Sequence, residues 1–242
     1  MAKLDEVDAL LVSEKMSEDD WKSLGEIVGP EFATGYERRE RMNKEIRHNY
    51  GHTFVNPFRE WYEPDYSELV KGTAEKLDIK IKEHHSVAEI EDKIIIEVID
   101  IAKAQIIKEK GLAAWKQIEH DTEQEITAMI DRGDMPPGVM EELKKTRGAA
   151  LMAALYAGRL AGFVLYQVAA QTFFQIAKFL GLRIGVAVAG PIIGGVLAFL
   201  LGPAGWLLAG LTLLFDLGNT NWKKTIPAVV TVAVLRRKYG LE

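Results

Sequence analysis

The sequence contains no cysteine among its 242 residues. Disulfide bonds, thiol-based catalysis and thiolate metal sites are therefore excluded. The first fifteen residues, MAKLDEVDALLVSEK, also lack the basic start and the apolar core that a secretory signal peptide requires. We therefore expect a cytoplasmic protein.

Recognisable catalytic machinery is absent as well. Eight glycines between positions 181 and 210 lack the preceding strand and the following lysine that a phosphate-binding loop needs. No pair of acidic or basic side chains has the arrangement expected of a general acid and a general base. We therefore expect a non-enzymatic protein with no cofactor.

Two histidine pairs are weak candidates for metal binding. His48 and His52 are four residues apart, a spacing that places two imidazoles on one helix face, but Gly51 between them is expected to end the helix. His84 and His85 are adjacent, and adjacent side chains diverge on a helix. We expect no metal site.

A third group, Glu119-His120-Asp121, has the composition of a pH-sensitive cluster. Neighbouring carboxylates raise the pKa of a histidine, which brings its titration closer to neutral pH. A solvated helix end is the explanation of the same three residues that we favour.

Charge is divided unevenly along the chain. Residues 1–150 hold 22 Lys and Arg against 33 Asp and Glu, whereas residues 151–242 hold 8 against 2. The acidic part thus carries a net charge of −11 and the apolar part +6. This asymmetry favours a membrane surface over nucleic acid as a partner, because a nucleic-acid binder gathers more basic side chains with exposed aromatics.

The apolar spacing predicts an all-α fold, with no convincing strand and no repeat. Ser86 and Glu89 form a capping box that begins one of the longest helices. The loop GDMPPG at 133–138 suggests a boundary between an acidic region, 1–135, and an apolar region, 136–242, which together could form one cooperative domain. Residues 51–64 are expected to be an ordered aromatic connector. The predicted helices are 4–11, 17–28, 31–50, 66–77, 86–110, 112–130 (with a second cap at Thr122), 139–180 and 222–239.

The most informative segment is 184–215, which runs for 32 residues without a charged side chain. Gly202-Pro203 divides it into apolar stretches of 18 and 12 residues, so it predicts two short helices joined by a tight turn. Such a hairpin either enters a bilayer or forms the buried centre of a helical bundle. We therefore predict a helical bundle around a central apolar hairpin.

If the hairpin enters a bilayer, its large apolar side chains are the membrane-inserting residues. Gly181-x3-Gly185 and Gly190-x3-Gly194 would allow close helix contact in lipid, although they serve equally well in a soluble core. The inserting residues are Ile184, Val186, Val188, Ile192, Ile193, Val196, Leu197, Phe199, Leu200, Trp206, Leu207, Leu208, Leu211, Leu213, Leu214 and Phe215.

Basic residues flank the hairpin on both sides, which favours keeping both of its ends at the cytosolic face. We expect this set to contact anionic lipid, although cations near a helix C-terminus also stabilise its dipole. The set consists of Arg183, Lys223, Lys224, Arg236, Arg237 and Lys238.

The C-terminal segment resembles the closing segment of the bacterial YaaW family, through T-I-P-A-V at Thr225–Val229 and L-R-R at Leu235–Arg237. Tyr66-Ser-Glu-Leu, Lys76-Leu77 and Ser86-x-x-Glu-Ile-Glu91 are similar to the middle of that family, and the first thirty residues to a module that often precedes it. The resemblance implies a link to ubiquinol–cytochrome c chaperones and brings no catalytic residues. The layout is also similar to colicin pore-forming and Bcl-2-type domains.

Two functions follow from these observations. The first is a membrane-associating or inserting helical protein, with pore formation as one form, located at the inner face of the membrane and bound to anionic lipid. The second is a chaperone-like or assembly factor that binds a protein partner and keeps the hairpin permanently buried. Neither requires nucleic acid, and both are compatible with an oligomer.

Overall fold

The structure is a computed structural model that describes residues 5–28, 36–51, 64–135, 137–146, 148–180 and 222–241. Within these ranges the chain is all-α, with no strand, as the sequence predicts. The helices are α1 (Glu6–Val12), α2 (Glu18–Val28), α3 (Tyr36–Gly51), α4 (Tyr66–Lys76), α5 (Val87–Lys110), α6 (Leu112–Arg132), α7 (Pro137–Lys145), α8 (Ala149–Tyr156), α9 (Gly162–Phe179) and α12 (Trp222–Lys238).

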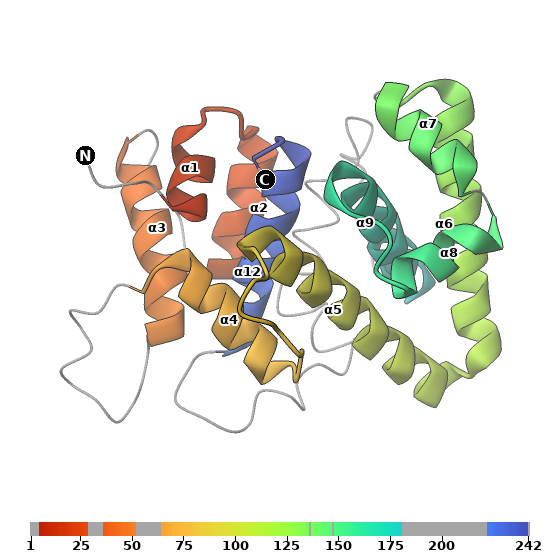
Figure 1. Cartoon of the computed structure of the whole chain (residues 1–242), viewed down its shortest axis with the longest axis horizontal. Helices are drawn as coiled ribbons and strands as arrows, with labels where there is room; N and C mark the ends of the chain where they lie inside the picture. The colour runs from red at the N-terminus through yellow and green to blue at the C-terminus, as the bar shows by residue number, and fades with distance from the viewer. Residues whose placement is uncertain are drawn as a thin grey trace.

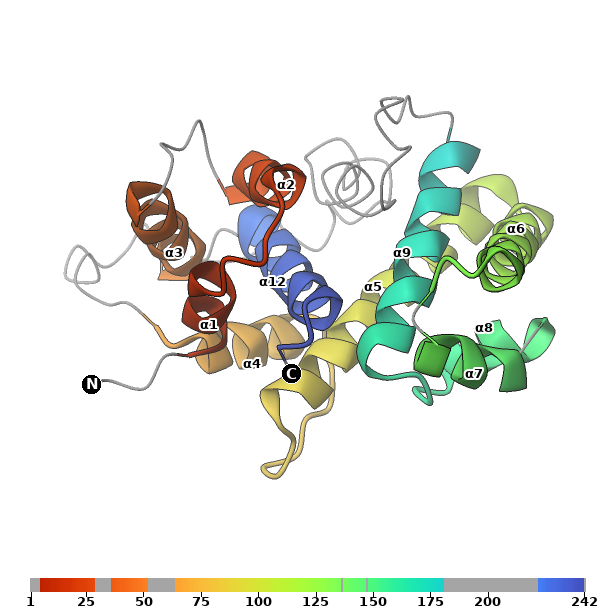
Figure 2. The same cartoon turned by 90° about the horizontal axis from the view of Figure 1, so that it is seen from above.

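Helix α5 joins two groups of helices (Figure 1). Helices α1–α4 lie on one side of it and α6–α9 on the other, and the view from above shows the same division (Figure 2). Helix α12 returns from the C-terminal end of the chain and packs against α1–α5 and also α9. The C-terminus therefore lies among the N-terminal helices.

Local signals determine several helix ends. The Ser86 hydroxyl accepts a hydrogen bond from the Glu89 backbone N–H at 3.2 Å, and the Glu89 carboxylate accepts one from the Ser86 backbone N–H at 2.7 Å. This confirms the capping box, which satisfies backbone donors that a helix start leaves unpaired. The predicted break at Gly111 is also confirmed, since its φ of 87° suits glycine.

The single helix predicted over 139–180 is wrong, because the chain forms α7, α8 and α9 there. Gly148 before α8, Gly158 after α8 and Gly162 at the first position of α9 all have positive φ angles. A glycine adopts this conformation without strain, so each position can reverse the chain. The predicted second cap at Thr122 is wrong too: Thr122 is buried within α6 and its hydroxyl donates to the Ile118 carbonyl.

Helices α9 and α12 form the apolar centre of the described structure. Every residue from Thr225 to Arg237 is buried, as is nearly all of α9 beyond Phe163. A helix that is buried around its whole circumference has neighbours on every face. The predicted hairpin of 184–215 and nearly all of the aromatic connector lie outside the described residues. The division at 135/136 stays a prediction.

Candidate functional site

A charged cluster is buried between α5 and α12. Glu91 of α5 has no exposed surface, and its Oε2 lies 2.6 Å from Arg236 Nη1 and 2.8 Å from Arg237 Nη1. Arg237 Nε also donates to Asp92 at 2.7 Å. Buried charges are tolerated when they are paired and hydrogen-bonded in this way. The cluster therefore attaches the last helix to the middle of the chain.

Tyr66 extends this cluster to α4. Its hydroxyl donates to Glu91 Oε1 at 2.8 Å and lies 3.3 Å from the Val229 carbonyl oxygen. Burial and the adjacent Glu91 carboxylate raise the pKa of Tyr66 well above its ordinary value. The phenol thus stays protonated and serves as a fixed hydrogen-bond donor rather than as a base.

A second cluster joins the C-terminus to α2. The buried Asp20 carboxylate accepts hydrogen bonds from Lys238 at 2.7 Å, from the Ser17 hydroxyl at 2.7 Å and from the Tyr239 hydroxyl. Burial alone would raise the pKa of Asp20, but these donors outweigh it and lower the pKa. Asp20 is thus held as a carboxylate, which is a structural role.

These clusters correct the expectation for anionic-lipid contact at the C-terminus. Arg236 and Arg237 are 4% and 1% exposed, and Lys238 is bound to Asp20, so none of the three offers a free cation at the surface of this fold. The partly buried Lys224 donates to the Val28 carbonyl at 3.2 Å. The Lys223 side chain, Arg183 and all sixteen proposed inserting residues lie outside what the structure describes.

The rings of His84 and His85 lie edge to face, with their centroids 5.1 Å apart. In the described part of the chain no three acidic or histidine side chains gather in a way that could hold a metal ion, and His52 falls outside that part. Glu119 accepts hydrogen bonds from Trp115 Nε1 and the Tyr156 hydroxyl, both at 2.8 Å, whereas the His120 ring contacts Gln124. In the group Glu119-His120-Asp121, Glu119 and His120 thus bind different partners.

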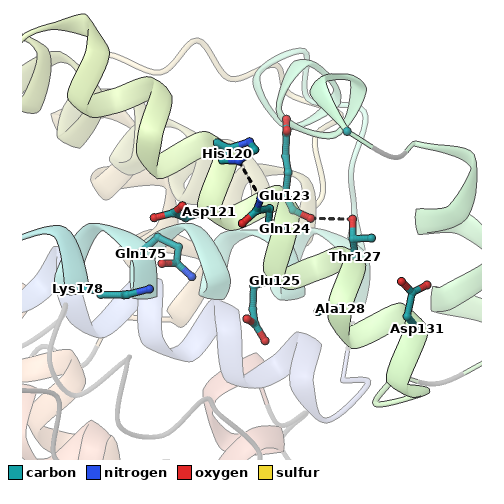
Figure 3. Close-up of a pocket in the computed structure, with 11 residues that line it drawn as sticks. His120, Asp121, Glu123, Gln124, Glu125, Thr127, Ala128, Asp131, Gln175 and Lys178 are labelled. Carbon is teal, nitrogen blue, oxygen red and sulfur yellow. Dashed lines mark hydrogen bonds between the residues drawn. The ribbon is translucent and has the colours of Figure 1, made fainter.

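One pocket of about 640 Å³ is built on the same stretch of α6 (Figure 3). Gln175 and Lys178 of α9 contribute to its wall, as does Gly148 before α8. The volume falls within the range of small-molecule sites, about 300–1,000 Å³. Four carboxylates of α6 line it: Asp121, Glu123, Glu125 and Asp131.

The pocket is rich in hydrogen-bond acceptors. Burial, followed by the Glu119 carboxylate, raises the pKa of Glu123. Gln175 is 4% exposed, and its side-chain oxygen has no hydrogen-bond partner in the structure described here. The arrangement suits a ligand that donates hydrogen bonds and carries positive charge.

Sequence reasoning missed both Glu91 and Gln175. Gln167, Gln171 and Gln175 recur every four residues in an otherwise apolar helix, and this polar stripe was the available signal for Gln175. Glu91 was named only within the segment that is similar to the YaaW family, and its buried role was not predicted, because its arginine partners lie about 145 positions away along the chain.

None of the described helices combines the length and the apolar character that a bilayer crossing requires. This finding covers α1–α9 and α12 and does not extend to residues 181–221.

The chain is similar to two UPF0174 proteins of Helicobacter pylori strain J99. It is 24% identical to one over 200 residues, which cover 82% of this chain and 71% of the relative. It is 25% identical to the other over 204 residues, covering 84% and 89%. No protein-family model matches the chain, and no solved structure matches it. These names carry no activity, and they do not bear on the resemblance to the YaaW family.

Proposed function

We propose that the chain is a non-enzymatic helical protein that associates with membranes through its apolar segment 184–215. The observation that carries this proposal is the run of 32 residues without a charged side chain. A segment of this composition gains about 1.5–3 kcal/mol for each large apolar side chain that leaves water. Lipid can supply that environment as well as a protein core can.

The packing of the neighbouring helices is compatible with a segment that acts on its own. Helices α9 and α12 flank the segment in sequence, and both are held firmly among other helices. At the far end of α12, Glu91 and Asp20 bind the basic residues that would otherwise favour anionic lipid. We therefore assign the attraction to lipid mainly to the apolar segment. Any electrostatic contribution to lipid binding would come from the basic residues that flank it, Arg183, Lys223 and Lys224.

The alternative is a chaperone-like interaction protein in which the same segment stays inside the protein. The extensive burial of α9 and α12 suits this alternative too, because both helices lead from the centre of the bundle into the segment. The two functions predict different effects of a charged residue placed inside the segment. In a membrane-associating protein it would first weaken vesicle binding, whereas in a protein that keeps the segment buried it would first disrupt folding.

Flotation of the purified chain with phospholipid vesicles tests the proposal. Ile193→Asp and Leu197→Asp each place a carboxylate in the middle of the longer apolar stretch, at an insertion cost of about 2.5–3.5 kcal/mol. Each variant should lose most vesicle binding while its circular dichroism spectrum remains helical.

Leu112→Asp is the matched control, because Leu112 is 54% exposed at the start of α6, where a carboxylate suits the helix dipole. It should float like the wild type. If Ile193→Asp instead unfolds the chain, and the wild type does not float with vesicles of any composition, the segment is core and the chaperone-like alternative replaces the proposal.

A further inference from the structure

An aromatic and basic patch lies where α12 begins. The Trp222 ring packs edge to face against the Tyr50 ring of α3, with their centroids 5.9 Å apart. Lys76 of α4 places its Nζ 6.0 Å from the centroid of the Trp222 ring, within reach of a cation–π contact. The three helices that carry these residues pack against one another (Figure 1). We call the three side chains the α12 entry patch.

The backbone of α4 determines how the patch is built. A Cβ added at Gly72 would lie only 2.7 Å from Tyr50 Cε2, so the absence of a side chain at Gly72 lets the Tyr50 ring lie directly on α4. Trp222, Tyr50 and Lys76 are each partly exposed, so the patch is in contact with solvent. Half-buried Trp and Tyr rings beside a lysine are typical of side chains that lie at a membrane–water interface.

The patch lies at one boundary of the apolar segment, because Trp222 is seven residues after Phe215. The other boundary has a similar composition: Lys178 and Phe179 are exposed at the end of α9, and Phe179 is five residues before Ile184. Figure 2 shows that α9 ends and α12 begins toward the same side of the molecule, the upper side of that view. If the apolar segment enters lipid, both of its boundaries therefore face the same surface.

The charge of the patch favours an anionic bilayer. Lys76 adds a cation at this boundary that does not flank the apolar segment in the sequence, and it lies over the Trp222 ring. A basic side chain close to an anionic membrane strengthens binding, and its long stem can pack on a neighbouring ring while the ammonium group reaches a phosphate. Glu75 is an exposed carboxylate next to Lys76, and it would oppose the same surface.

We propose that the α12 entry patch lies in the headgroup region of an anionic phospholipid bilayer when the chain is bound to a membrane. This inference rests on the proposed function, and it adds which face of the folded helices meets the lipid. In this orientation the Trp222 and Tyr50 rings lie among the headgroups, and Lys76 binds lipid phosphate.

Flotation of a double variant with anionic vesicles tests the patch, and the chain offers a matched control. Trp222→Leu/Lys76→Gln removes the aromatic–cation pair of the patch, and it should weaken binding roughly fivefold or more. Trp21→Leu/Arg38→Gln removes the same kind of pair between α2 and α3, where the Arg38 guanidinium carbon lies 5.5 Å from the centroid of the Trp21 ring. Arg38 is twelve residues before Tyr50 on α3, about 18 Å along the helix, so this control should bind like the wild type.

A gain of binding separates a role of the patch from loss of structure. Glu75→Gln removes the carboxylate that opposes an anionic surface, and it should strengthen binding to anionic vesicles roughly twofold or more. Binding to neutral vesicles should stay unchanged. Glu14→Gln is the control, because Glu14 is also exposed but lies next to Lys15, which contacts the far end of α12 at Tyr239. It should leave both affinities unchanged.

A fluorescent label locates the patch in the bound state without altering its three side chains. The chain has no cysteine, so a single introduced cysteine can carry the environment-sensitive dye NBD. On Glu75→Cys the dye should brighten and shift to shorter wavelength when anionic vesicles are added. On Val12→Cys, at the end of α1, where Val12 is 45% exposed, it should stay unchanged. Circular dichroism checks the fold of every variant, and the label carries the test if Trp222→Leu/Lys76→Gln does not fold.

The results distinguish a failure of this inference from a failure of the proposed function. The inference alone is wrong if the wild type floats and Ile193→Asp does not, but the dye beside the patch shows no change and Trp222→Leu/Lys76→Gln binds as tightly as the wild type. It is also wrong if the dye at position 12 responds instead, because another face would then meet the membrane. If the wild type does not float with any vesicle, the proposed function fails and this inference fails with it.

Discussion

At the residue scale, the Glu91 side chain of α5 connects two other helices, α4 and α12. It is fully buried and bonds two arginines of α12 and the Tyr66 hydroxyl at once. In the sequence it is one acidic residue among many on a charged helix, and Arg236-Arg237 reads as an exposed basic end. Pairing across 145 positions is a tertiary event, so helical spacing could not reveal it.

Replacing Glu91 by Gln should destabilise the chain by about 3–5 kcal/mol, because two buried guanidinium groups lose their shared carboxylate. Urea unfolding followed by circular dichroism measures the loss. The control is Glu18→Gln, whose carboxylate is 81% exposed and pairs with Arg38, so that loss should stay below about 1 kcal/mol. Equal losses in the two variants would mean that the buried cluster has no special role.

At the element scale, most helices follow from apolar spacing and caps, and their predicted ends agree closely with the structure. The segment 139–180 was the exception, because a single helix was predicted across three glycines that lie at the ends of α8 and α9. Periodicity reports which residues can share a face, whereas a glycine with positive φ is recognised only once the backbone path is known.

Two glycine substitutions with opposite expected effects on the stability of the chain test this explanation. Gly158 has a φ of 62° and open space beside its Cα, so Gly158→Ala should cost about 1–2 kcal/mol from backbone strain alone. Gly138 lies inside α7, also with open space, and Gly138→Ala should stabilise the chain by about 0.5–1 kcal/mol. Thermal unfolding of both variants is the measurement. Stabilisation by Gly158→Ala would show that α8 and α9 can join as one helix.

At the scale of the whole molecule, the all-α class follows from the sequence, but the way its two ends meet does not. The charge asymmetry suggests an acidic region that is separate from an apolar one. In the structure, α12 of the apolar region packs among the helices of the acidic region, and Lys15 Nζ donates to the Tyr239 carbonyl at 3.1 Å. The candidate pocket, by contrast, lies between α6 and α9, and its polar stripe on α9 was visible in the sequence before its position was known.

This arrangement predicts that residues 1–135 do not fold alone. Without α12 the fragment would leave Glu91 without its two arginine partners and would expose the apolar faces of α2, α4 and α5 that α12 covers. Residues 1–135 should therefore lack a cooperative urea transition.

A second fragment joins residues 222–242 through a flexible linker to the N-terminus of residues 1–135. This linked fragment should regain a cooperative urea transition, because the Lys15–Tyr239 contact places the end of α12 close to α1. In the linked fragment, Arg236→Ala/Arg237→Ala should remove the transition again. A cooperative transition in residues 1–135 by themselves would mean that the acidic region is an independent domain and that α12 only covers it.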